Sequence, residues 1–115
     1  MHTDPNCLFC KIAAGQIPSK KVYEDDEILA FHDIHPWAPV HILLIPKRHI
    51  ESMVDVTEEH AALLGRMMAV SPRLMRELGV AHGFRHVVNT GRDGMQEVPH
   101  LHVHCMGGPR PWLKG

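Results

Sequence analysis

The sequence predicts an α+β fold, in which a mostly antiparallel sheet packs with one long and one short helix. Three observations favour this class: short apolar segments typical of strands recur along the chain, one long segment carries a helical pattern, and strands do not alternate with helices as parallel βαβ units require. A chain of 115 residues is about the size of one domain. We therefore expect residues 1–115 to form a single domain.

The first half of the chain is expected to hold the short helix and three strands. Asp4, Pro5 and Asn6 offer capping groups before a helix across 7–14. Residues 21–33 contain two apolar segments separated by acidic residues, which is typical of a β-hairpin. A proline-bracketed loop at 35–39 leads into an apolar strand at 40–46.

The second half is expected to hold the long helix and two more strands. Residues 55–80 place apolar side chains at helical spacing, with Thr57 as a suitable N-cap. Proline removes a helical hydrogen bond and clashes with the preceding turn, so Pro72 predicts a kink or break near Val70. Residues 84–89 form the next strand.

The last strand carries the most unusual pattern. Residues 98–108, VPHLHVHCMGG, place His100, His102 and His104 at every second position. Residues two apart on a strand share one face and lie about 6 to 7 Å apart, so three imidazoles would share one small patch. The opposite face, toward the core, would carry Leu101, Val103 and Cys105.

This histidine patch predicts chemistry rather than packing. Desolvated imidazoles are unfavourable together unless a metal, an anion or mutual hydrogen bonds compensate. A neutral imidazole can attack phosphorus and form a covalent intermediate, while neighbouring histidines and backbone N–H groups can stabilise phosphate oxygens. His41, Asn89 and the glycine-containing loop 91–94 are candidates to join such a site. The residues alone leave two possibilities open: phosphorus chemistry by histidine, and a histidine-rich metal site.

The cysteines raise a separate question. Cys7 and Cys10, in the sequence CLFC, could hold a tetrahedral metal ion, form a redox pair or pack in the core. Cys105 is poorly placed to join them. A zinc ion would need two further ligands, for which His49 and the histidines at 100–104 are candidates.

Composition argues against several classes of protein. A net charge of −1 offers no basic surface for nucleic acid. No apolar stretch approaches the ~18 residues of a membrane span, and the N-terminal residues lack the pattern of a signal peptide. We expect a cytoplasmic protein that binds neither nucleic acid nor membrane.

Two separated blocks of sequence resemble a known family. Residues 100–106, HLHVHCM, fit the signature His-φ-His-φ-His-φ-φ, where φ is apolar, of the histidine triad (HIT) superfamily. Residues 7–50, CLFCKIAAGQIPSKKVYEDDEILAFHDIHPWAPVHILLIPKRHI, strongly resemble its Hint branch, the histidine triad nucleotide-binding proteins. The resemblance runs from Cys7 to Trp112. It implies a HIT-like fold with a sheet of about five antiparallel strands, continued into the sheet of a second subunit in a homodimer.

Family members bind purine nucleoside monophosphates and hydrolyse AMP or GMP linked through phosphorus to an amine. The resemblance implies that His102 is the nucleophile and that His104 contacts the phosphate and assists the leaving group. His41 and His100 would complete the cluster, and Asn89 matches an asparagine near the phosphate.

Further matches concern the rest of the nucleotide. Asp33 matches a carboxylate that holds the ribose hydroxyls, although from the residues alone it could equally cap the loop that follows. The wall of the base pocket is matched by Leu8, Phe9, Ile12, Phe31, His32 and Ile34. Glu97, beside Val98, stands where many relatives have serine, and it must either face solvent or alter the leaving-group preference. The tail also differs in detail around Trp112, which the resemblance places toward the partner's site.

The resemblance also implies a structural zinc. Related galactose-1-phosphate uridylyltransferases hold zinc with a Cys-x-x-Cys pair, a downstream histidine and the first histidine of the triad. The matching positions are Cys7, Cys10, His49 and His100. Zinc there would orient His100 beside the nucleophile.

The principal prediction is a hydrolase of purine nucleoside phosphoramidates that forms a covalent nucleotidyl-histidine intermediate. Three alternatives are a dinucleoside polyphosphate hydrolase of the fragile-histidine-triad type, a nucleotide-binding regulatory protein with incidental turnover, and a zinc module with a structural or metal-handling role.

Overall fold

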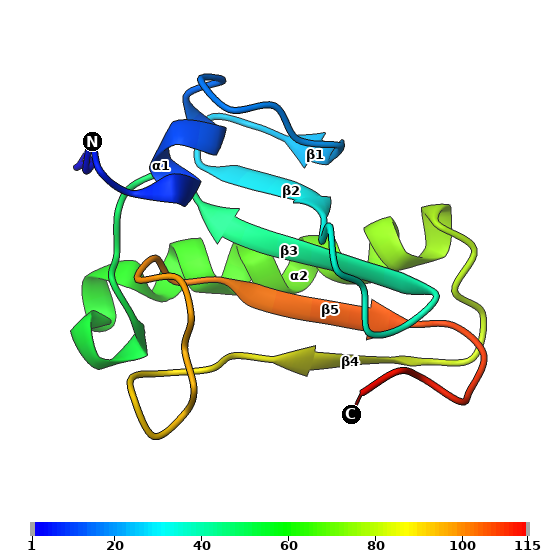
Figure 1. Cartoon of the computed structure of the whole chain (residues 1–115). Helices are drawn as coiled ribbons and strands as arrows, with labels where there is room; N and C mark the ends of the chain where they lie inside the picture. The colour runs from blue at the N-terminus through cyan, green and yellow to red at the C-terminus, as the bar shows by residue number, and fades with distance from the viewer. Residues whose placement is uncertain (1, 115) are drawn as a thin grey trace.

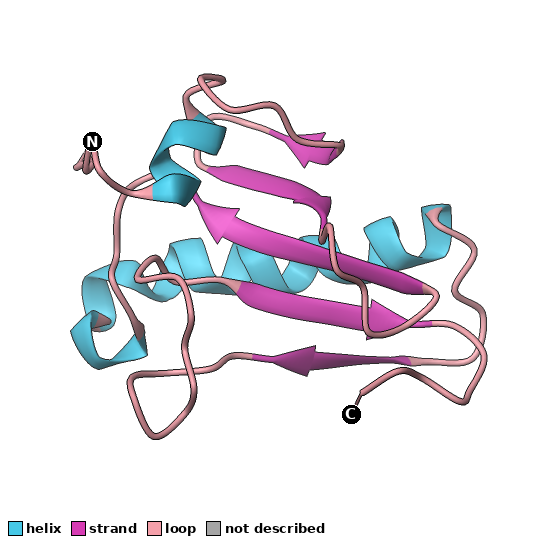
Figure 2. Cartoon of the chain, viewed as in Figure 1, coloured by secondary structure: helices cyan, strands magenta, loops and turns pink. Residues whose placement is uncertain are grey.

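The computed structural model describes residues 2–114 as one five-stranded antiparallel sheet with helices on its faces (Figure 1; Figure 2). Its elements are α1 (Leu8–Ala13), β1 (Lys21–Glu24), β2 (Ile28–His32), β3 (Val40–Pro46), the 3-10 helices Met53–Asp55 and Glu58–His60, α2 (Ala61–Glu77), β4 (Phe84–Val87) and β5 (Val103–Gly107). The strands lie in the order β1-β2-β3-β5-β4, and each neighbouring pair is antiparallel. The predicted α+β class and the hairpin of β1 and β2 are confirmed.

Alternate side chains of the central strands face different helices. Ile28 and Ala30 of β2 belong to the core that α2 covers, whereas Leu29 and Phe31 pack with Phe9 of α1. The two helices accordingly lie on opposite faces of the sheet, α2 behind it and α1 in front in Figure 1. The face that α1 covers only in part is the one that presents the histidines.

The histidine segment differs from its prediction in one respect. Leu101, Val103 and Cys105 are buried in the core with α2, as the alternation predicts. The strand itself begins only at Val103, so His100 and His102 precede it. The reason is that the main-chain N–H of Leu101 donates to the carbonyl of Ile50, 2.7 Å away, in a loop and not in a neighbouring strand.

The helix boundaries also differ from prediction. Cys7 is itself the N-cap of α1, because its sulfur accepts from the main-chain N–H of Cys10 at 3.4 Å. The long helix begins as a 3-10 turn after Thr57, whose main-chain N–H donates to Nδ1 of His60 at 3.0 Å, and becomes α-helical at Ala61.

Of the kink or break that Pro72 predicts near Val70, the break is wrong, because the α2 helix is continuous across Pro72. Proline leaves the carbonyl of Met68 without its usual helical donor, and the hydroxyl of Ser71 donates to that carbonyl at 2.9 Å instead. Across residues 2–114, no helix is both long and apolar enough to cross a membrane.

Candidate active site and metal centre

Four histidines and Phe9 form a buried cluster on the face that carries α1. His41 of β3 and His104 of β5 have ring centroids 5.1 Å apart, and His102 lies 5.1 Å from His104. The ring of Phe9 lies 5.2 Å from His102 and 5.9 Å from His100. The structure thus brings together the histidines that the sequence grouped, and their individual roles remain predictions.

Carbonyl groups determine where the ring protons of two histidines lie. A carbonyl oxygen only accepts, so the ring nitrogen bonded to it must donate. Nδ1 of His102 donates to the carbonyl of His100 at 2.7 Å, and Nε2 of His100 donates to the carbonyl of Pro46 at 2.7 Å. In the neutral rings, Nε2 of His102 therefore holds a lone pair suited to nucleophilic attack, and Nδ1 of His100 holds one suited to metal binding.

His41 and His104 are linked in a hydrogen-bonded relay. The main-chain N–H of Trp37 donates to Nδ1 of His41 at 3.0 Å, so Nε2 of neutral His41 carries the proton and donates to Nδ1 of His104 at 2.9 Å. Neutral His104 then presents an Nε2–H group. Burial, together with the charges of His102 and His41, lowers the pKa of His104 to about 4. This ring is therefore a neutral hydrogen-bond donor near pH 7, a group that can hold a phosphate oxygen.

A second group joins α1 to the segment before β5. The ligand atoms of Cys7, Cys10, His49 and His100 all lie within 4.8 Å of one another. Sγ of Cys7 lies 3.3 Å from Nδ1 of His100, and Sγ of Cys10 lies 3.5 Å from Nδ1 of His49 and of His100. Burial lowers the pKa of His100 to about 4, so its ring is neutral near pH 7. Two thiol sulfurs and two imidazole nitrogens suit a tetrahedral site of the kind that zinc prefers, and these residues fit a metal ion.

Asp33, His41 and His104 also have ligand atoms within 4.8 Å of one another. Their hydrogen bonds favour a relay over a metal site. A metal on Nε2 of His41 would displace its proton to Nδ1, where the main-chain N–H of Trp37 already donates. Two donors would then face each other. The group with the cysteines has no such conflict at His100, whose Nδ1 is the unprotonated nitrogen of the neutral ring.

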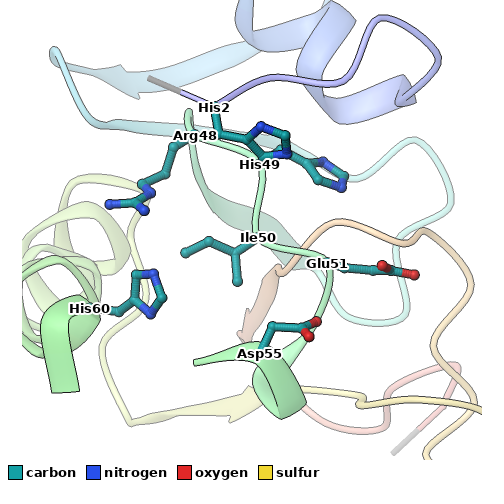
Figure 3. A pocket seen from close by; sticks show the side chains of 7 residues that line it. All are labelled: His2, Arg48, His49, Ile50, Glu51, Asp55 and His60. Carbon is teal, nitrogen blue, oxygen red and sulfur yellow. The ribbon is translucent and has the colours of Figure 1, made fainter. Parts of the chain in front are cut away.

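A pocket of about 330 Å³ opens beside the metal-ligand group. It is lined by His2, Arg48, His49, Ile50, Glu51, Asp55 and His60 (Figure 3). The rings of His2 and His49 meet edge to face at 5.6 Å, side by side in Figure 3. A metal site needs an entry path, and this pocket brings solvent to His49. A second pocket of about 330 Å³ lies around Gln96. His102 and His104 line neither of these two pockets, so the histidine cluster is recognised by its side chains and not by a cavity.

The residues matched to the base pocket are divided between core and surface. The buried ones are Phe9, Ile12 and Phe31, the exposed ones are Leu8 (45%) and Ile34 (86%), and His32 is half-buried. Val98, a further candidate for contact with the nucleotide, is also half-buried. Phe9 and Phe31 meet edge to face at 5.6 Å. A base-binding wall made by this single chain would thus rest on Phe9 and its buried neighbours, with the exposed Leu8 and Ile34 at its edge.

The candidate phosphate and ribose residues lie around the histidines. Asp33 caps the loop that follows it, since Oδ1 accepts from the main-chain N–H of His35 at 2.8 Å, as the sequence allowed. Its Oδ2 lies 3.5 Å from Nε2 of His41. Asn89 is half-buried just after β4.

The departures from the family pattern lie at the surface. Glu97 is exposed and lines a pocket with Glu51 and Arg92, which corresponds to the solvent-facing alternative. The indole N–H of Trp112 donates to the carbonyl of Gly108 at 3.0 Å. Within residues 2–114 of this one chain, Trp112 therefore packs against its own tail.

Sequence reasoning missed Trp37 and the carbonyl of Pro46. Trp37 stands between prolines four positions before His41, and this aromatic in a constrained loop was the available signal. The main-chain carbonyl of Pro46 accepts a hydrogen bond from His100, 54 positions away. No pattern of residue types predicts such a contact.

Comparison with known proteins relates this chain to a family. The HIT domain family model matches residues 14–110. Protein HitA of Neisseria gonorrhoeae is 52% identical over 104 residues, covering 90% of this chain and 97% of that protein. The purine nucleoside phosphoramidase of Escherichia coli strain K12 is 47% identical over 102 residues, covering 88% and 86% respectively.

Solved structures share the fold. A histidine triad protein from Clostridium difficile is 44% identical with a TM-score of 0.90, covering 95% of this chain and 96% of that chain. A HIT family hydrolase from Legionella pneumophila is 46% identical with a TM-score of 0.88, covering 91% and 95%. The expected HIT-like fold is confirmed, and the chain belongs to the HIT domain family.

Proposed function

We propose that this protein is a nucleotide hydrolase of the Hint branch that cleaves purine nucleoside phosphoramidates. The observation that carries the proposal is the bond from Nδ1 of His102 to the carbonyl of His100, at 2.7 Å, which leaves Nε2 of His102 unprotonated in the neutral ring. The similarity to a purine nucleoside phosphoramidase, at 47% identity, supports the choice of substrate class.

The reaction proceeds in two displacements at phosphorus. Nε2 of His102 attacks, a nitrogen–phosphorus bond to the histidine forms, and the bond to the amine breaks while the amine takes up a proton from solvent water. A water molecule then attacks phosphorus, its proton returns to solvent, the bond to His102 breaks, and the nucleoside monophosphate leaves. In the transition state of each displacement, Nε2–H of His104 donates to the phosphate oxygen on which charge develops, and Nε2–H of His41 donates to Nδ1 of His104.

We propose that the metal-ligand group holds zinc through Cys7, Cys10, His49 and His100. Zinc would hold these four side chains together and would take no part in the displacements. Its effect reaches the nucleophile through His100, because the main-chain carbonyl of this residue holds Nδ1 of His102.

We further propose a homodimer that forms along β4. This strand lies at the edge of the sheet, so one side of its backbone has no strand partner within the described chain. Phe84 and Val88 are 38% and 37% exposed at this edge. A second copy of β4 would cover both side chains and extend the sheet.

A substrate panel tests the function. Purified protein is assayed with an AMP-amine, a GMP-amine and a dinucleoside polyphosphate, with His102→Ala as the matched control. The proposal expects the phosphoramidates to be cleaved fastest and His102→Ala to be inactive but folded. Faster cleavage of the dinucleotide would make the protein a polyphosphate hydrolase, and tight AMP binding without cleavage of any compound would make it a nucleotide-binding regulator.

A further inference from the structure

We infer that Trp37 is a positioning residue that holds the pair His41 and His104 in the arrangement in which His104 presents its Nε2–H group. The catalytic part of this inference rests on the proposed function. The structural part concerns the histidine pair itself and is measured without substrate.

The first observation is the contact between the rings. The indole of Trp37 lies nearly parallel to the imidazole of His104, with centroids 5.8 Å apart and an interplanar angle of 12°. It meets His41 edge to face at 5.8 Å and 63°. Both are favourable aromatic geometries. The indole therefore keeps water from one face of His104 and limits rotation of that ring.

The second observation is the main-chain bond from Trp37 to His41. Its N–H donates to Nδ1 of His41 at 3.0 Å and thereby assigns the proton of this ring to Nε2, which faces His104. The same residue thus controls His41 through its backbone and His104 through its side chain. Side-chain substitutions other than proline keep the N–H, so they test the indole alone.

The third observation is that the C-terminal segment after β5 holds the loop that carries Trp37. The main-chain N–H of Leu113 donates to the carbonyl of Trp37 at 2.7 Å, and Nζ of Lys114 lies 5.1 Å from the centroid of the indole. At Gly108, an added Cβ would lie 2.7 Å from Cβ of Pro39, so glycine permits the loop to approach this segment closely. Trp37 is therefore fixed against the histidines.

Several charged or titratable groups face this pair. His102 lies beside His104 on the same segment, and Asp33 lies 3.5 Å from Nε2 of His41. Lys114 of the tail lies over Trp37. Arg85 of β4 opposes Met106, two positions beyond His104, and its guanidinium lies 5.7 Å from the ring of Trp112. Of these groups, Lys114 lies against Trp37. Its charge could affect the pKa of His104, so a Lys114 variant serves as a control.

The experiment follows the ring protons of His104 by NMR as a function of pH, with the His104 resonance identified by its loss in His104→Gln. In the unaltered protein, we expect a pKa near 4 and an Hε1 resonance displaced by the ring current of the indole. Trp37→Gln is expected to raise the pKa of His104 by about one unit, since water gains access to the ring, and to abolish the displacement. Trp37→Phe, which retains a flat ring, is expected to keep most of both effects.

Kinetics provides the second measurement. With an AMP-amine substrate, Trp37→Gln is expected to lower kcat by about tenfold with little change in KM, because it disturbs a group that acts in the transition state. Trp37→Phe is expected to retain most of the activity. If the unaltered protein does not cleave the phosphoramidate, the proposed function fails, whereas the NMR titration still decides whether Trp37 positions His104.

Two results would overturn the inference. One is an unchanged His104 titration and Hε1 position in Trp37→Gln. The other is an equal rise of the His104 pKa in Lys114→Met, which would assign the effect to the tail cation and not to the indole. Folding is checked by circular dichroism, and Trp37→Leu replaces the glutamine variant if the latter is unfolded.

Discussion

At the level of single residues, four histidines with the same ring chemistry differ because their nitrogens have different partners. Nδ1 of His102 and Nε2 of His100 donate to carbonyls, whereas Nδ1 of His41 accepts from a main-chain N–H. In the neutral rings, His102 therefore has its lone pair on Nε2, His100 has its lone pair on Nδ1, and His41 donates a hydrogen bond to His104. These differences arise from the backbone around the rings.

Loss of one cysteine tests the metal centre. Cys7→Ser is expected to lose bound zinc and to lower Tm by on the order of 5 to 10 °C, because one of four ligands is removed and folding and metal binding are coupled. Metal content and thermal unfolding measure this. Cys105→Ala is the matched control, since Cys105 lies in the core with α2 and apart from the ligand group. Zinc content near one per chain in Cys7→Ser would contradict the assignment.

The sequence predicted the candidate residues better than their connections. Spacing grouped His100, His102 and His104, and the resemblance supplied Cys7 with its partners. The carbonyl of Pro46 was not predictable, because a main-chain acceptor has no residue type. Trp37 is visible in the sequence as an aromatic residue in a constrained loop, but its stacking on His104 depends on the folded path. Hydrogen-bond partners across the chain are a property of the fold and not of the motif.

At the level of elements, apolar alternation predicted the buried face of a strand correctly. The tendency of proline to break a helix predicted a break that α2 does not have. The alternation of residues 100–105 predicted correctly that Leu101, Val103 and Cys105 face the core, because burial of one face is a strong constraint. Pro72 did not break α2, since the hydroxyl of Ser71 satisfies the carbonyl of Met68 that proline leaves without a donor. A neighbouring side chain can thus replace the helical hydrogen bond that proline removes.

This compensation predicts coupling between two neighbouring positions. Ser71→Ala is expected to lower the free energy of unfolding by about 1 to 2 kcal/mol, because the carbonyl of Met68 and Nε2 of His86 both lose their partner. In a Pro72→Ala background the loss should be smaller, since the new N–H at position 72 can donate to Met68. Urea unfolding of the four proteins measures the coupling. Equal losses in both backgrounds would show that Ser71 does not compensate for Pro72.

Asp25 joins the hairpin of β1 and β2 to α2. Tyr23 donates its hydroxyl proton to Asp25 at 2.6 Å, and Arg66 of α2 forms an ion pair with the same carboxylate. Burial raises the pKa of Asp25, but hydrogen bonds from Tyr23, from two main-chain N–H groups and from Arg66 outweigh this effect and lower the pKa to about 2. Folding thus favours the ionised form of this side chain.

The lowered pKa gives a pH dependence with a definite sign. The stabilisation is present above the ordinary pKa of 3.8 and is lost as the pH falls toward 2. Asp25→Asn is therefore expected to reduce the free energy of unfolding by about 1 to 2 kcal/mol at pH 7, with the difference shrinking between pH 4 and pH 2. Denaturant unfolding across this range checks it, with exposed Asp26→Asn as the control. A difference that stays constant down to pH 2 would be inconsistent with this role.

At the level of the whole molecule, the two faces and one edge of the sheet differ in what they carry. The α2 helix covers one face and completes the core, the opposite face carries the histidines beside α1, and β4 forms an edge.

Phe84→Glu or Val88→Glu is expected to shift a dimer toward monomer by placing charge at the β4 edge. Light scattering with size exclusion measures the mass, and a dimer that persists in both variants would place the subunit interface elsewhere.

The central claim is that Nε2 of His102 becomes bonded to phosphorus during turnover. The most direct measurement is mass spectrometry of protein quenched in alkali during hydrolysis of an AMP-amine. The account predicts an adduct of one nucleotidyl group on the peptide that contains His102, absent from His102→Ala, which should also be inactive. An adduct at another residue, or turnover by His102→Ala, would contradict it.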